Sequence, residues 1–127
     1  KEEVTGKVAV HGVVPCLQRL LQTARGNLYQ KQKQLKMFPD FSVFFVITDI
    51  NLKFGFSMVD FSPVEIREPQ TSTDRYLQMT LDQNTFLEWM LGLEDFNMLD
   101  SGHRIEFFRS PNIYIEEVYF LLSLLRL

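Results

Sequence analysis

The chain has 127 residues, of which 46% are apolar and 13% are aromatic, with one cysteine and a formal net charge of −3. This apolar share excludes an intrinsically disordered chain, and the length suits one domain with one core. A single cysteine excludes a disulfide framework and a cysteine-rich zinc site. The sequence has no run of about 18 apolar residues, so it contains no predicted transmembrane segment.

Charge divides the chain into two unequal parts. Residues 1–39 carry seven basic and two acidic residues, whereas residues 40–127 carry six basic and fourteen acidic ones. The basic part fits the solvated face of a helix, and the acidic remainder would repel a nucleic-acid backbone. We therefore expect no nucleic acid partner.

Targeting signals, the cysteine content and the C-terminal residues bear on where the protein is located and on whether it belongs to a longer chain. No signal peptide and no Asn-x-Ser/Thr sequon occur, and the lone Cys16 suits a reducing compartment, so a cytoplasmic location is expected. The sequence ends in Leu124-Leu-Arg-Leu127, whereas free C-termini are usually polar. We therefore expect residues 1–127 to be a single domain excised from a longer protein.

The first predicted helix spans Pro15–Leu35. Pro15 suits the first helical position, where its missing N–H costs nothing. Leucines recur at helical spacing along one side. The predicted apolar face contains Leu17, Leu20, Leu21, Ala24, Leu28 and Leu35, and the predicted solvent face contains Gln18, Arg19, Gln22, Arg25, Lys33 and Gln34.

Strands are predicted next. The segment Phe41–Ile50 is β-branched and aromatic and has no Gly or Pro, which is typical of a strand covered on both faces. Further strand segments are Phe54–Phe61, a short piece at Val64–Arg67, Tyr76–Leu81 and Arg104–Arg109. Short connections between consecutive strands favour an antiparallel meander.

Three more helices are predicted. Asp82 is the expected N-cap of the second helix, Leu81 and Phe86 occupy hydrophobic-staple positions, and Gly92 is the expected terminator. A short helix follows at Glu94–Asp100. The last helix is predicted over Asn112–Leu127 after Ser110-Pro111, and it is apolar almost all round from Val118 onward. Such a helix is buried on every side or contacts a partner or a ligand.

Catalytic candidates are few. His11 and His103 are the only histidines, too few and too far apart in the sequence for a His-based metal site. His11 and Cys16 are five residues apart, but a buried thiol beside a solvated histidine explains them without chemistry. No phosphate-binding glycine loop or serine-nucleophile elbow occurs. The sequence therefore predicts a domain that is not an enzyme and has no cofactor.

From Tyr76 to Leu127 the sequence resembles the sterol-carrier-protein-like family of non-specific lipid-transfer domains. The matching parts are Leu77–Leu81, Asp82–Leu87, Gly92, Gly102, Ile105–Phe108 and Ile113–Leu125. The resemblance implies an α+β fold, with a curved, mostly antiparallel sheet of about five strands and helices packed on one face. It further implies an apolar cavity that binds a fatty acyl or sterol-like ligand.

Strand alternation and helix faces select the candidate cavity residues. They are Phe45, Ile47, Phe56, Met58, Leu77, Met79, Phe86, Met90, Phe107 and Leu122. Aromatic rings supply apolar area and thioether chains adapt to variable ligands. The same composition is also typical of a closely packed core.

Three functions remain open from sequence alone. The first is a lipid-binding or carrier module. The second is a non-catalytic accessory domain of a larger enzyme, with a homodimer or a neighbouring domain contacting Val118–Leu127. The third is a small enzyme that uses Cys16 or His103.

Overall fold

The computed structural model describes residues 2–70 and 74–127, with side chains described from residue 13 onward. The elements in chain order are helix α1 (Glu2–Leu35), strand β1 (Ser42–Ile47), a 3₁₀ turn (Thr48–Ile50), β2 (Leu52–Ser57), β3 (Tyr76–Leu81), α2 (Gln83–Met90), α3 (Phe96–Ser101), β4 (Glu106–Ser110) and α4 (Glu116–Leu122). The predicted α+β class is confirmed.

The four strands form one mixed sheet in the order β2-β1-β3-β4. β1 and β2 are antiparallel with Val43 opposite Phe56, and β3 and β4 are antiparallel with Met79 opposite Phe107. The central strands β1 and β3 are parallel, with Val43 opposite Leu77. The prediction of about five mostly antiparallel strands in a meander was therefore wrong.

The connection between β2 and β3 explains this difference. Because β2 runs opposite to β1, it ends where β1 begins, and the chain then passes to the far side of β1 before it starts β3. The predicted piece Val64–Arg67 supplies only an isolated bridge between Glu65 and Gly55 of β2. Pro63 and Pro69 flank this piece, and proline lacks the N–H that a strand ladder needs.

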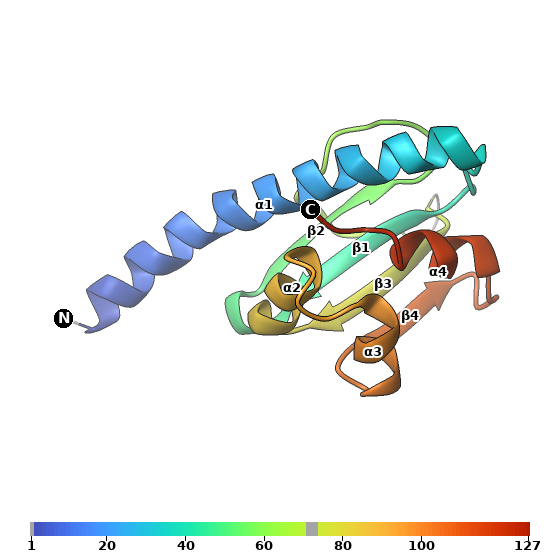
Figure 1. The fold of residues 1–127 in the computed structure, drawn as a ribbon. Coiled ribbons are helices and arrows are strands. Elements are labelled where there is room, and N and C mark those ends of the chain that lie inside the picture. The colour runs from blue at the N-terminus through green and yellow to red at the C-terminus, as the bar shows by residue number, and fades with distance from the viewer. Residues whose placement is uncertain (1, 71–73) are drawn as a thin grey trace.

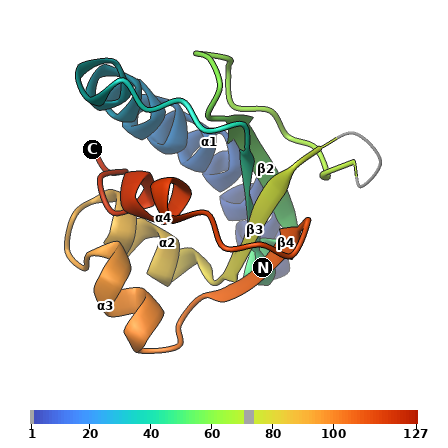
Figure 2. The same ribbon diagram turned by 90° about the vertical axis from the view of Figure 1, so that its right-hand side faces the viewer.

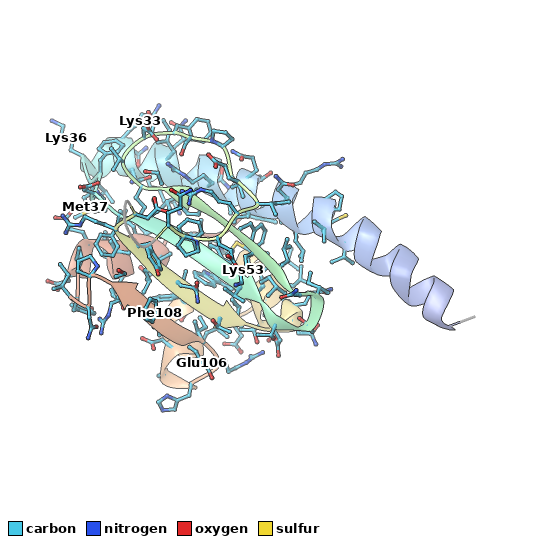
Figure 3. All side chains as sticks on the ribbon, turned by 180° about the vertical axis from the view of Figure 1, so that it is seen from behind. Lys33, Lys36, Met37, Lys53, Glu106 and Phe108 are labelled. Atoms are coloured by element: carbon cyan, nitrogen blue, oxygen red, sulfur yellow. The ribbon has the colours of Figure 1, made fainter. Side chains whose placement is uncertain are left out.

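All four helices lie on one face of the sheet, as Figure 2 shows, which confirms that part of the expected architecture. Strand alternation directs Val43, Phe45 and Ile47 of β1 towards this helical layer. Figure 3 shows Lys53, Glu106 and Phe108 on the opposite face of the sheet. The sheet is not strongly curled, in contrast to the curved sheet that was expected (Figure 1).

Helix α1 is longer than predicted and contains Pro15 in its interior. A proline inside a helix removes one backbone hydrogen bond, and here the helix continues on both sides of it. Its N-terminal half extends beyond the sheet, whereas its C-terminal half packs on it (Figure 1). Leu17, Leu21 and Leu28 are buried as predicted, but Leu35 is 45% exposed.

The core between sheet and helices is built around a cluster of rings. The ring of Phe45 lies 5.4 Å from that of Phe86, 5.5 Å from that of Trp89 and 6.0 Å from that of Phe54, measured between centroids. Trp89 in turn lies 5.1 Å from Phe96. We call these five residues the aromatic core. The cluster joins β1 and β2 to α2 and α3, so it fixes the helical layer on the sheet.

The predicted start of α2 is confirmed. The Asp82 carboxylate accepts a hydrogen bond from the Thr85 backbone N–H at 2.7 Å, and Leu81 and Phe86 are both buried. Asp49 provides a second acceptor at this end of the helix, because its carboxylate accepts a hydrogen bond from the Gln83 backbone N–H at 3.0 Å. Gly92 follows the helix with a φ of +75°, a left-handed conformation that favours glycine.

The last helix, α4, is shorter than the predicted Asn112–Leu127. Residues Pro111 to Tyr114 are exposed and carry the chain from β4 to the helical layer, so the helix begins only at Glu116. After Leu122 the chain runs back alongside α1 and α2 (Figure 1). The Leu127 N–H donates to the Met90 carbonyl at 2.9 Å, and Lys31 Nζ donates to the Leu124 carbonyl at 3.3 Å.

Candidate functional site

The structure brings all ten predicted cavity residues into one continuous core. Nine are buried, and Phe107 is half-buried at the margin of the same cluster. They come from β1, β2, β3, β4, α2, α4 and the residue after β2. The prediction that they line a ligand cavity stays a prediction.

A surface hollow of about 280 Å³ lies at one margin of this core. It is lined by Met37 from the turn after α1 and by Glu116, Glu117 and Phe120 of α4. Met37 also packs against the core cluster. The hollow therefore marks the place where α4 meets the turn after α1.

α4 itself contributes to the core of its own chain. Val118, Leu121 and Leu122 are buried, as is Leu125 in the segment that follows. Phe120, at 44% exposed, is the large apolar side chain of α4 that faces outward. No side chain caps the N-terminus of α4, which follows Ile115 in an extended conformation.

A buried polar group lies at the end of the sheet where α1 ends and β1 begins. Arg25 of α1 has no exposed surface. Its Nη1 donates to Gln32 Oε1 at 3.0 Å, and its Nη2 donates to the carbonyls of Ser57, at 2.8 Å, and of Asp60. We call Arg25, Gln32 and the backbone carbonyls they contact the Arg25 corner.

Gln32 completes the Arg25 corner. It is also fully buried, and its Nε2 donates to the carbonyls of Met37 and Met58, both at 3.0 Å. The two side chains thus connect α1 to its own terminal turn and to the end of β2. Burial lowers the Arg25 pKa to about 10, although the nearby Asp60 opposes this effect, so the guanidinium is charged at neutral pH.

Three aromatic rings surround the Arg25 guanidinium. Its Cζ lies 4.8 Å from the ring centroid of Phe56, 5.5 Å from that of Phe61 and 5.6 Å from that of Tyr29. The ring quadrupole attracts a cation placed over the ring face. Phe56 also belongs to the predicted cavity set, so the Arg25 corner adjoins the apolar core.

The sequence interpretation placed Arg25 on the solvent face of the helix, which was wrong. Arg25 follows Leu21 by four residues and precedes Leu28 by three, which is the spacing of the apolar stripe itself. Gln32 continues this stripe four residues after Leu28. The helical spacing of Arg25 therefore indicated a buried position, whereas its charged residue type indicated an exposed one.

The catalytic candidates from the sequence do not converge. Cys16 was expected to be a buried thiol, which was wrong: it is exposed on α1, where it lines a hollow of about 330 Å³ with Arg19, Leu20 and Thr23. His103 is exposed in the turn after α3. The side chain of His11 lies outside the described residues. Over residues 13–70 and 74–127, no three His, Cys, Asp or Glu side chains gather as a metal site would require.

Among the helices formed by the described residues, none has both the length and the apolarity that crossing a bilayer requires.

Comparison with known proteins gives a structural likeness. No family model matches the sequence, and no curated protein matches it. Among solved structures, the chain is similar to one described as "UbiJ-SCP2 Ubiquinone synthesis protein", with a TM-score of 0.44 and 10% sequence identity. The likeness covers 94% of this chain and 97% of that one.

Proposed function

We propose that this domain binds a fatty acyl or sterol-like ligand between the inner face of its sheet and the helical layer. The observation that carries the proposal is the composition of this interior. Four strands and four helices direct phenylalanine, methionine and leucine side chains to one continuous apolar core. Each methylene group of an acyl chain buried there contributes about 0.8 kcal/mol without any directional contact.

Three methionines give this interior adaptable walls. Met58, Met79 and Met90 have no exposed surface and come from three different parts of the chain. Methionine has three rotatable bonds and a polarisable sulfur, so it repacks around apolar groups of different shape. An interior of this kind accommodates a flexible chain by rearranging side chains while the sheet stays in place.

α4 is the element that would move to admit the ligand. It is a seven-residue helix without a side-chain N-cap, and the hollow lined by Met37 and Phe120 separates it from the turn after α1. Short helices depend on tertiary packing for stability, so local opening of α4 costs less than opening the sheet. The ligand would enter at this hollow.

Trp89 offers a direct test, because it is the only tryptophan of the chain and is buried beside Phe45. Hexadecanoate with bromine at mid-chain is titrated against the protein while Trp89 fluorescence is recorded. We expect saturable quenching that unlabelled hexadecanoate reverses. Quenching that is absent, or that rises linearly without saturation, would contradict the proposal.

A matched control places the fluorescent tryptophan at the surface of the protein instead of in the core. Leu93, just after α2, is 72% exposed. In the double variant Trp89→Phe, Leu93→Trp, the bromine of a bound chain lies away from the indole, so saturable quenching is expected to disappear. Equal saturable quenching of both proteins would place the ligand on the surface.

A further inference from the structure

The positive charge of Arg25 is buried without an ion-pair partner among the residues that the structure describes. Asp60 provides a carbonyl oxygen and a nearby charge, but its carboxylate forms no ion pair with the guanidinium. Within the same described residues, the buried Arg25 Nε has no hydrogen-bond partner. A fully buried cation thus retains one unused donor.

Holding backbone carbonyls does not by itself require this charge. A neutral amide also donates to carbonyl oxygens, as Gln32 does beside Arg25. Burying an ion without a partner of opposite charge is unfavourable, and an anion that binds beside it offsets part of this cost. The Arg25 corner therefore has the chemistry of an anion site.

The surroundings of Arg25 define what kind of anion fits. On one side, the guanidinium lies over the Phe56 ring. Phe56 in turn contacts Phe45 of the aromatic core, with 6.5 Å between the centroids of these two rings. On the other side, the Phe61 ring covers the guanidinium and is itself 51% exposed. Phe61 stacks on Tyr29 with 4.9 Å between ring centroids, and it is the most exposed of the three rings around the guanidinium. A rotation of Phe61 is therefore the movement that would begin to open a path to the cation. An anionic group at Arg25 would thus have an apolar core behind it.

We propose that Arg25 is the binding residue for the carboxylate of a long-chain ligand whose apolar part lies along Phe56 into the core. This inference rests on the proposed function and deepens it, because it assigns the ligand an acidic head. The carboxylate would accept a hydrogen bond from the free Nε–H and would neutralise the buried charge. Guanidinium and carboxylate form charge-assisted hydrogen bonds, which are stronger than neutral ones.

Three probe ligands distinguish the contribution of the acidic head to affinity from that of the apolar tail in the unmodified protein. They are hexadecanoate, hexadecanol, which has the same tail without the charge, and acetate, which has the head without the tail. We expect hexadecanoate to bind roughly ten- to a hundredfold more tightly than hexadecanol, the usual range for a hydrogen bond to a charged group. Acetate at equal concentration is expected not to displace either.

The Arg25→Gln variant tests whether Arg25 is the source of this preference. It keeps a side-chain amide as donor to the carbonyls of Ser57 and Asp60 but removes the charge. Its affinity for hexadecanoate is expected to fall to that for hexadecanol, so that the preference of the wild-type protein for the acid disappears. The matched control, Lys33→Gln, removes an exposed cation that lies 5.1 Å from the same Tyr29 ring. This control is expected to change the preference less than about threefold, because an exposed charge is screened.

The wild-type protein gives a readout that does not depend on folding of a variant. The Arg25 Nε–H resonance in ¹⁵N nuclear magnetic resonance is expected to shift with hexadecanoate and to stay in place with hexadecanol. Equal affinity for acid and alcohol, or a preference that persists in folded Arg25→Gln protein, would overturn the role of Arg25 and leave the carrier function standing. If neither long-chain probe binds, both proposals are overturned.

Discussion

The aromatic core and the Arg25 corner lie within the same buried layer but are built on opposite principles. Around Phe45 the contacts are between rings at 5.4–6.5 Å, and none depends on a donor or an acceptor. Around Arg25, beside the ring contacts, directional hydrogen bonds run from a guanidinium or amide to a particular oxygen. In the proposed site, the apolar region would hold a ligand tail of variable shape, whereas the buried charge would select the chemistry of the ligand head.

The largest expected effect comes from placing a charge in the apolar region. Leu122 of α4 is fully buried, so Leu122→Glu is expected to lower the free energy of unfolding by more than about 4 kcal/mol and abolish the cooperative urea transition. Phe120→Glu, on the exposed side of the same helix, is expected to change it by less than about 1 kcal/mol. A folded, monomeric Leu122→Glu protein, obtained from a dimeric parent, would instead favour the accessory or dimerisation function.

A smaller but still large effect is expected in the Arg25 corner. Gln32→Leu removes the acceptor of Arg25 Nη1 and the donor to two buried carbonyls. An unsatisfied buried polar group costs about 1–3 kcal/mol, so we expect a loss of roughly 2–4 kcal/mol in urea unfolding. Gln34→Leu, at an exposed position of α1, is the control and is expected to stay within about 0.5 kcal/mol of the parent. A loss no greater than that of the control would show that the corner is not a connected network.

The smallest effect is expected at the surface, where Asp82 caps α2. Asp82→Ala is expected to cost about 0.5–2 kcal/mol. The hydrogen bonds with Thr85 lower the Asp82 pKa below its ordinary value, despite partial desolvation. A carboxylate with a depressed folded-state pKa stabilises the protein above its unfolded-state pKa, and this contribution is lost as the pH falls through the folded-state pKa. The difference between parent and Asp82→Ala should therefore shrink under acidic conditions, and a difference constant with pH would contradict the cap.

Local signals in the sequence predicted local structure well. The features at both ends of α2 depend on neighbours within a few residues, so the sequence predicted them. They are the cap at Asp82, the staple of Leu81 and Phe86 and the helix end at Gly92. The period-two alternation in β1 and β3 likewise assigned Phe45, Leu77 and Met79 to the inner face.

Features that depend on distant parts of the chain were not readable in this way. The parallel pairing of β1 with β3 joins residues that are more than thirty positions apart in the sequence, such as Val43 and Leu77, and no local pattern encodes it. The burial of Arg25 depends on carbonyls of Ser57 and Asp60, more than thirty residues away, that supply its partners. Residue type predicted an exposed arginine, and only the helical spacing pointed to the interior.

The central claim, that a long apolar chain binds inside the core, is tested most directly by its contacts with the methionines. Met58, Met79 and Met90 are fully buried, whereas Met98 on α3 is 60% exposed. With ¹³C-labelled methionine methyl groups and hexadecanoate, we predict intermolecular nuclear Overhauser effects to the three buried methyl groups and none to Met98. Contacts to Met98 alone, or to none of these methyl groups, would contradict the claim.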